Sequence, residues 1–314
     1  RGGRPYPKGG VVTAKTASVR ARMPRWLPGL LLVSPSIVAI AVFVYGMLGW
    51  NFKVALSDQH DEVSEGSFVG LENFINIWQE TRWILSVQHA IVFTVVFVGG
   101  ALVLGWFLAF LMEKGIKGEG GFRAIYLFPM AISFIATGVV WRWLMNSATG
   151  ERAVGLNALF RFLGLDFLQW QWFRDPDWGM AAMAIPAIWQ MSGYVMALFL
   201  AGFRGVPEEL REAARVDGCN EWQVYRWVIL PHLRPVTLAA LIILGHISLK
   251  VFDLIVSVSG KQIITDVPAI FMWTAVYDAH DPAKGATIAG YIVLSVAIFV
   301  VPYLIWNARR EKRK

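Results

Sequence analysis

Residues 87–112 read VQHAIVFTVVFVGGALVLGWFLAFLM, an apolar stretch without Asp, Glu, Lys or Arg. A helix needs about 20 apolar residues to cross the hydrocarbon core of a bilayer, so this stretch can span one. Further blocks approach the same length at Leu27–Gly49, Ala124–Leu144, Met180–Phe203, Pro235–Ser257 and Ala286–Trp306. The sequence therefore predicts an all-α, polytopic membrane protein of about six transmembrane helices.

The composition excludes an ordinary soluble protein, because 56% of the residues are hydrophobic and only 16% are charged. The connections between the blocks are short, so we expect one membrane domain and no separate soluble domain. The first block is too long for the core of a signal peptide, and we expect it to be a retained span. Kinks are expected at the prolines within the blocks, which are Pro35, Pro129, Pro186 and Pro302. Gly105 and Ala109 form a small-x-x-x-small pair that would let two helices approach closely.

The net charge of +7 collects at the two chain ends, which favours membrane orientation over nucleic-acid binding. Cations concentrate in cytoplasmic segments, so both termini are expected in the cytoplasm and an even number of spans follows. The cations of the ends are Arg1, Arg4, Lys8, Lys15, Arg20, Arg22, Arg25, Arg309, Arg310, Lys312, Arg313 and Lys314. The acidic residues of the first outer connection are Asp58, Asp61, Glu62, Glu65, Glu72 and Glu80.

The two later outer connections contain segments expected at the membrane surface. Trp170, Trp172, Phe173 and Trp178 suit an aromatic belt at the headgroup level. Residues 157–164 could form a short amphipathic helix there. The apolar run 269–276 is too short to span, so we interpret it as interfacial or re-entrant.

The most informative connection is VPEELREAARVDGCNEWQVYRWVILP, residues 206–231, on the inner side. Pro207 suits the start of a helix, and the acids that follow it suit the positive end of the helix dipole. Leu210, Ala213 and Ala214 are expected to share one face, with Arg211 and Arg215 directed elsewhere. Asp217 and Gly218 should supply a turn and end the helix.

Such a helix is too polar to enter lipid and should lie at the cytoplasmic surface. Small side chains would let a partner protein approach its backbone closely. The alternative is a solvated helix without a partner, and the local features leave both interpretations open.

The same segment resembles the EAA motif of ABC importer permeases. Glu212-Ala213-Ala214 is followed after three residues by Gly218, then after nine by Val228, where the family usually has Ile, and then by Leu230-Pro231. The resemblance implies a type I permease fold with a cytoplasmic coupling helix seated in an ATPase subunit. The coupling residues it implies, with their charged neighbours, are Glu208, Glu209, Glu212, Ala213, Ala214, Asp217 and Gly218.

Chemistry is not expected in this chain itself. The sequence contains no G-x-x-x-x-G-K-[ST] phosphate loop, so ATP and Mg would be bound by separate ATPase subunits. The lone Cys219 cannot form an intrachain disulfide, and no metal-type Cys/His cluster is present. We therefore predict no catalytic residue, metal site or cofactor.

Resemblance to the maltose-type carbohydrate permeases extends over nearly the whole membrane region. It is carried by Phe68–Phe74, Ala124–Pro129 and Phe252–Ile255, and it implies a sugar site near the bilayer midplane. Polar groups inside a bilayer are costly and therefore suggest function, although each could instead bond between helices or snorkel. The candidate substrate residues are Gln190, Met191, Tyr194, Ser248, Lys250 and Asp253.

The resemblance implies an importer in a bacterial or archaeal cytoplasmic (inner) membrane. Its partners would be a second homologous permease, two ABC ATPases, an extracytoplasmic sugar-binding protein, the sugar and lipid. The Asp266–Pro268 stretch and Phe271-Met272 look somewhat like glucose or mannose permeases. We expect basic tails at 1–26 and 309–314, a permease domain at 27–308 and a coupling loop at 204–233. The alternatives are an ion-coupled secondary transporter, which should show inverted repeats and intramembrane carboxylates, and a membrane enzyme.

Overall fold

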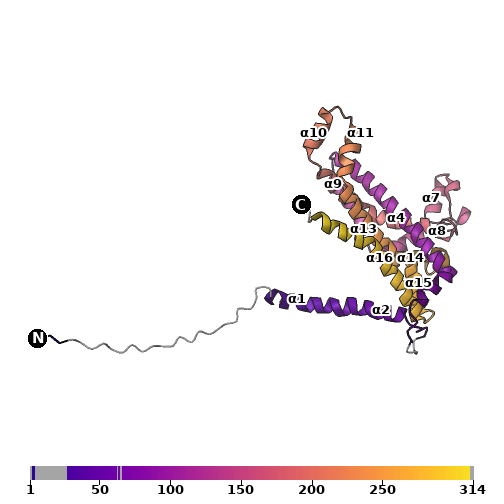
Figure 1. Ribbon diagram of the computed structural model, residues 1–314. Coiled ribbons are helices and arrows are strands. Elements are labelled where there is room, and N and C mark those ends of the chain that lie inside the picture. The colour runs from indigo at the N-terminus through magenta and orange to yellow at the C-terminus, as the bar shows by residue number, and fades with distance from the viewer. Residues whose placement is uncertain (1, 4–26, 62, 64–65, 312–314) are drawn as a thin grey trace. The chain divides into compact units, whose positions relative to one another are not determined.

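The computed structural model describes residues 2–3, 27–61, 63 and 66–311 (Figure 1). The chain divides into two units, residues 1–49 and 50–314. The first unit holds α1 (Leu27–Ile40), the π-helical η1 (Ala41–Gly46) and the start of α2 (Met47–Ala55). From Gly29 to Ala55 the helix is long and apolar enough to span a membrane, as the sequence predicts for this block. The expected basic tail 1–26 lies outside the described residues, except for Gly2 and Gly3.

Three long spans of the second unit agree with the expected blocks. They are α4 (Thr81–Glu113), α8 with α9 (Gly179–Ala182 and Ala184–Arg204) and α16 (Pro282–Glu311). The expected tail from residue 309 instead begins as the last turn of α16, up to Glu311. Within the described residues, four helices pass the length and hydropathy test for a span, or six if each of two bent pairs counts once.

The third expected span, 124–144, is not one straight helix. It consists of α5 (Glu119–Leu127), the 3-10 helix η3 (Phe128–Ala131) and α6 (Phe134–Leu144), with a bend of 98°. Pro129 lies in η3 and Ile132 is extended, which interrupts the helical hydrogen bonds. Ser133 then caps α6 by accepting the Ala136 N–H at 3.2 Å. The kink expected from Pro129 is therefore confirmed, but it is a full break.

The fifth expected span, 235–257, is also wrong as a single helix. Its first part is α13 (Arg234–Leu249), which meets the segment before the expected span at 58°. That segment comprises α11 (Glu221–Val224), the π-helical η7 (Tyr225–Ile229) and α12 (Leu230–His232). At its other end α13 stops at Leu249, and a separate helix, α14 (Asp253–Ser259), packs against α6.

Close packing of α4 against α9 forms the core of this unit. A Cβ added to Gly105 would meet Val195 at 2.6 Å, so the two backbones approach as closely as the small-residue pair predicts. Similarly, a Cβ at Gly193 would meet the Tyr126 carbonyl oxygen at 1.8 Å, which seats α5 on the other side of α9. Phe93, Phe97 and other side chains of α4 are completely buried in this core.

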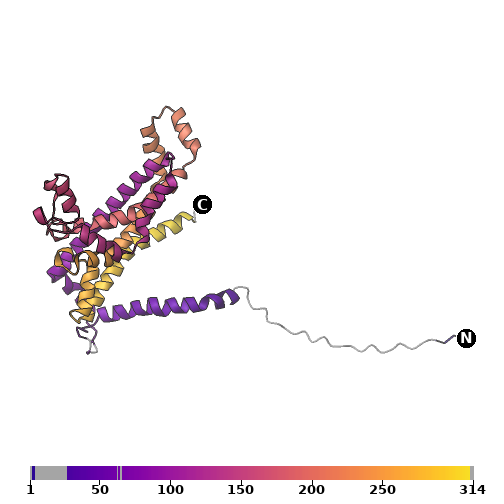
Figure 2. The same cartoon turned by 180° about the vertical axis from the view of Figure 1, so that it is seen from behind.

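Shorter elements occupy the connections. They are α3 (Glu72–Asn76), η2 (Ile77–Gln79), η4 (Gly150–Arg152), α7 (Leu156–Phe162), η5 (Asp166–Leu168), η6 (Trp172–Arg174), α10 (Glu208–Val216), η8 (Ile263–Thr265) and α15 (Pro268–Tyr277). The expected helix at 157–164 is confirmed as α7. The apolar run at 269–276 is the helix α15, which packs against α16 and α4. Within the second unit, α10 and α11 lie beyond the C-terminal end of α4, at the opposite end of that helix from α15 (Figures 1 and 2).

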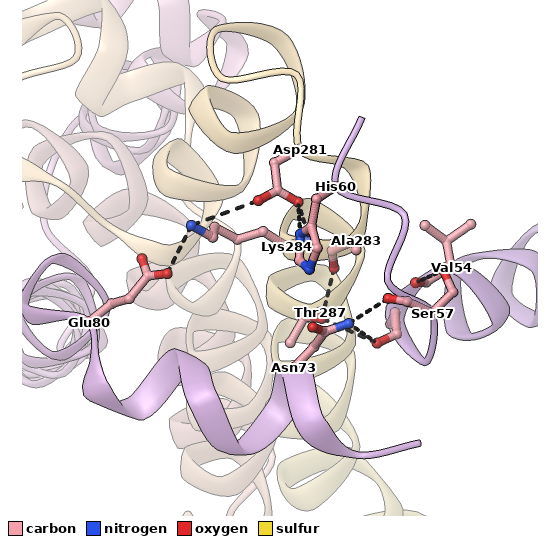
Figure 3. A network of polar contacts seen from close by, with 10 residues as sticks. Val54, Ser57, His60, Asn73, Glu80, Asp281, Ala283, Lys284 and Thr287 are labelled. Atoms are coloured by element: carbon pink, nitrogen blue, oxygen red, sulfur yellow. Dashed lines mark hydrogen bonds and ion pairs between the residues drawn. The ribbon is translucent and has the colours of Figure 1, made fainter. Parts of the chain in front are cut away.

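A polar network joins the connection between α2 and α4 to the start of α16 (Figure 3). Asn73 donates to the Ala55 and Ser57 carbonyl oxygens at 3.0 and 2.7 Å. The His60 ring nitrogen lies 2.9 Å from the Asp281 carboxylate. Lys284 lies 2.8 Å from the Glu80 carboxylate at the foot of α4. The Phe68–Phe74 motif therefore has a structural explanation, because its asparagine anchors this loop.

A second tertiary contact at the same end of α4 is an ion pair between Arg82 and the buried carboxylate of Asp266. The Arg82 Nε lies 2.6 Å from Asp266 Oδ2, and the Asp266 side chain is only 1% exposed. The Asp266 backbone carbonyl also lies 3.0 Å from the His89 ring. Burial raises the pKa of the Asp266 carboxyl above its ordinary value, and the Arg82 guanidinium opposes that rise.

We expect Arg82→Met to lower the free energy of unfolding by about 3 kcal/mol, because it leaves the Asp266 carboxylate buried without its cation. A carboxyl with a raised folded-state pKa binds its proton more tightly in the folded state. The destabilisation by the unpaired carboxylate is therefore absent below the pKa that Asp266 has in the unfolded chain. It grows as the pH rises from that value through the pKa of the folded state. The loss should be larger at pH 8 than at pH 5, measured by thermal unfolding in detergent micelles.

Lys261→Met is the matched control for Arg82→Met. Lys261 lies 2.7 Å from Asp278 Oδ2, but both side chains of this pair are exposed, so we expect a change of at most about 1 kcal/mol. Equal losses in the two variants would refute the role assigned to burial at Asp266.

Candidate functional site

The helix expected in the inner connection is α10, and local hydrogen bonds define both of its ends. Pro207 precedes it with extended backbone, and Glu208 and Glu209 occupy its first turn. At its C-terminus the Gly218 N–H donates to the Arg215 carbonyl at 3.0 Å and the Cys219 N–H to the Ala214 carbonyl at 3.0 Å. This pattern is a Schellman motif, and Gly218 has the positive φ of +85° that the motif requires. The predicted stop at Asp217-Gly218 is confirmed.

A second helix, α11, begins directly after this turn. Asn220 accepts the Gln223 N–H at 2.9 Å, and the Gln223 side chain accepts the Asn220 N–H at 2.8 Å, which together form a capping box for α11. Pro231 lacks an N–H, and the π-helical turn η7 lies immediately before it. The EAA-like segment is thus two helices joined by a tight turn.

One face of α10 makes no contact with the rest of the described chain that would bury it. Glu209, Glu212, Ala213 and Val216 recur at i, i+3, i+4 and i+7, and all four are exposed. Val216 is 86% exposed. This outward face combines carboxylates with a small and an apolar side chain, and it is free to receive a partner.

The opposite face of α10 corrects one expectation. Ala214 is buried and Arg211 points into the protein, so Ala213 and Ala214 do not present one common surface and Arg211 does not project away. Arg211 Nη1 lies 2.6 Å from the Glu113 carboxylate at the end of α4, and Nη2 donates to the Phe203 carbonyl of α9 at 2.8 Å. Of the expected coupling residues, Ala214 therefore packs inward.

Asp217 and Glu208 flank the outward face. Asp217 is the C-cap residue of α10 and is exposed. Glu208 lies 3.3 Å from Arg215, which in turn lies 3.0 Å from Glu221 of α11. These exposed pairs contribute little to stability, but they fix the charge pattern around the helix.

The candidate substrate residues of α9 stand at i, i+1 and i+4 and therefore share one face of that helix, but they differ in exposure. Gln190 is buried, and its Nε2 donates to the Ile132 carbonyl at 2.6 Å, within the break between η3 and α6. Its Oε1 is buried with no hydrogen-bond partner among the described residues. Met191 is buried, whereas Tyr194 is partly exposed. Trp189, beside them, packs edge-on against Trp141 of α6 with ring centroids 5.9 Å apart.

The candidates near α13 do not share one helix. Ser248 is buried, donates to the Gly245 carbonyl at 2.8 Å and accepts from Thr94 of α4 at 3.0 Å. Lys250 is the C-cap residue of α13, and Asp253 is the first residue of α14. Both are exposed at the break. Gln190 and Ser248 thus donate or accept hydrogen bonds with neighbouring elements, whereas Tyr194, Lys250 and Asp253 are at least partly exposed.

Sequence reasoning missed the residues on which α10 rests. Glu113 closes the long apolar helix α4, and its side chain is only 6% exposed. Tyr225 of η7 donates its hydroxyl to the second carboxylate oxygen of Glu113. The sequence signal that could have found them is Glu113 itself, a carboxylate directly after the apolar block 87–112.

Comparisons with known proteins agree with this arrangement. Residues 101–311 match the family model "Binding-protein-dependent transport system inner membrane component". The chain is 36% identical to a probable ABC transporter permease protein of Pyrococcus horikoshii over 90% of this chain and 97% of the relative. It is 31% identical to a xylose/arabinose import permease protein of Haloferax volcanii over 87% of this chain and 86% of that protein.

The fold is shared with a solved structure. A chain from the crystal structure of a bacterial ABC transporter that imports the acidic polysaccharide alginate superposes with a TM-score of 0.70. The match covers 91% of this chain and 96% of the other at 20% identity. The chain therefore belongs to the binding-protein-dependent transport family as the multi-pass inner-membrane permease component of an ABC transporter, whose ATPase lies in partner subunits.

Proposed function

We propose that this chain is one of two homologous permease subunits of an ATP-driven sugar importer, and that α10 is its coupling helix. The observation that carries the proposal is the free outward face of α10, held on the ends of α4 and α9. Two ATPase subunits that close on ATP would move α10, and that motion would open the core toward the exterior. A sugar-loaded external binding protein would then release its cargo into the open core.

The orientation is part of the same proposal. The cations of the two chain ends favour a cytoplasmic location for both termini, and an even number of spans is consistent with it. On this topology α10 faces the cytoplasm, where ATP is available. The polar network of Figure 3 then lies on the outer side, at the surface that a binding protein would approach.

The proposed substrate is a monosaccharide or a short oligosaccharide, with glucose and mannose as the first candidates. The Haloferax volcanii relative, named for xylose and arabinose import, supports a small sugar. Partly exposed Tyr194 offers the combination of aromatic surface and hydroxyl that suits a sugar. The proposed site also draws on Gln190, Met191, Ser248, Lys250 and Asp253.

We expect Tyr194→Ala to raise the apparent KM for sugar uptake about tenfold, because it removes a hydrogen-bonding and packing partner of the ligand. The measurement is uptake of labelled glucose, mannose, xylose and maltose by vesicles containing the assembled transporter. Tyr194→Phe, which keeps the ring, should change the KM less. A reduced protein level at an unaltered KM would mean that Tyr194 is structural.

A further inference from the structure

A largely buried cluster of two charged side chains and one hydroxyl side chain holds the inward face of α10. Arg211 of α10, Glu113 of α4 and Tyr225 of η7 come from three separate elements. Arg211 Nη1 lies 2.6 Å from one Glu113 oxygen, and the Tyr225 hydroxyl donates to the other. The Arg211 and Glu113 side chains are 14% and 6% exposed. Each Glu113 oxygen thus has its own partner, one on either side of the Gly218 turn.

An aromatic layer lies beneath this cluster. Tyr225 packs edge-on against Phe110 with centroids 5.2 Å apart, and Phe110 stacks on Trp106 at 5.5 Å. Phe203 completes the layer from α9, at 6.4 Å from Tyr225. Apolar surroundings strengthen a hydrogen-bonded ion pair once it is formed and make either partner costly to leave alone. We therefore expect the contact of Glu113 with Arg211 and Tyr225 to keep one geometry.

The chain connections on either side of α10 are short, and each contains a glycine. Only Gly205, Val206 and Pro207 lie between α9 and α10, and the turn at Gly218 separates α10 from α11. A helix joined through a glycine at each end could pivot when pushed from outside. The Arg211 bonds to Glu113 and to the Phe203 carbonyl oppose that pivot at both α4 and α9.

We propose that Glu113, Arg211 and Tyr225 are positioning residues of energy coupling, which clamp α10 to α4 so that its displacement moves the packed α4–α9 pair. This inference rests on the proposed coupling role of α10 and adds the path by which its motion enters the membrane domain. The three residues touch neither sugar nor nucleotide. They act through the rigidity of the contact.

The first test needs no partner subunit and uses hydrogen–deuterium exchange of the whole purified chain. In Arg211→Gln the amides of α10 should exchange at least about tenfold faster than in the wild type, because the helix loses its attachment. Arg204→Gln is the control, since Arg204 makes an exposed pair with Glu119 at 2.7 Å near the same end of α9. Unchanged α10 protection in Arg211→Gln would overturn the clamp.

The second test measures sugar imported per ATP hydrolysed by the assembled transporter. A variant that merely folds poorly lowers both rates together, whereas loss of the clamp should lower the ratio at least about fivefold in Glu113→Gln. Tyr225→Phe keeps its aromatic contacts and should lower the ratio less. The exchanged pair Glu113→Arg with Arg211→Glu should recover only part of it, because arginine cannot accept the Tyr225 hydroxyl and glutamate cannot donate to the Phe203 carbonyl. A ratio unaffected in Glu113→Gln and Tyr225→Phe would overturn the proposal.

The two arms separate failure of the clamp from failure of the proposed function. If no ATPase subunit co-purified with the wild-type chain, the proposed coupling role of α10 would be refuted, and so would the clamp, which rests on that role. If ATPases co-purified and the ratio stayed constant in the variants, the importer function would stand and only the clamp would be refuted.

Discussion

Gly218→Val is expected to reduce sugar uptake more than tenfold while leaving the protein in the membrane. Gly218 has a φ of +85°, a conformation that costs an L-residue about 1–2 kcal/mol and a β-branched residue more. No atom lies within 4 Å of an added Cβ, so the cost arises from the backbone and not from a clash within the chain. Relief of that strain would break the Schellman motif and turn α10 relative to α11.

Gly218→Asn is the matched control, because asparagine tolerates the left-handed conformation better than any branched residue. It should retain most of the uptake at a similar bulk. Immunoblots of the membrane fraction would show whether both variants reach the membrane in equal amount. Normal uptake by Gly218→Val would contradict the role of this turn.

Ala213→Trp is expected to abolish co-purification of the ATPase subunits, with a loss of at least about tenfold. Ala213 lies on the exposed face of α10 between Glu209 and Val216, so a large side chain there would hold a partner away from the helix backbone. The fold should not suffer, since the position is open to solvent. The measurement is the amount of ATPase recovered with an affinity-tagged permease.

The control for Ala213→Trp is Ala213→Ser, which stays small and should recover ATPase at the wild-type level. Thermal unfolding of both variants should match that of the wild type. Full recovery of ATPase with the tryptophan variant would place the partner interface elsewhere.

Most of the membrane architecture follows from local sequence, because a span depends on the length and apolarity of one segment. The blocks at 87–112 and 180–203 correspond to α4 and α8–α9. The breaks in the third and fifth expected spans could not be predicted in the same way, because the length and apolarity of a block do not locate a bend within it. At the first break Gln190, distant in the sequence, donates to the Ile132 carbonyl that the helix leaves free.

In the candidate coupling site too, some features follow from local sequence and others depend on tertiary contacts. The ends of α10 were predictable because Pro207 and Gly218 act through their own backbones. The face of α10 that points outward could not be predicted. Glu113 draws Arg211 inward, and the sequence of the loop alone does not identify Glu113 as the partner of Arg211. An arginine on a short polar helix ordinarily lies in solvent, and here a tertiary ion pair overrides that tendency.

The most direct test of the proposed importer function is to measure whether transport needs ATP and on which side of the membrane the ATP must be supplied. The chain has one cysteine, Cys219, directly after the α10 turn, so a membrane-impermeant maleimide can report which side α10 faces in each proteoliposome preparation. With ion gradients collapsed, labelled sugar should be transported only when ATP is supplied on the side where Cys219 reacts. Transport that continues without ATP and follows an imposed ion gradient would contradict the account.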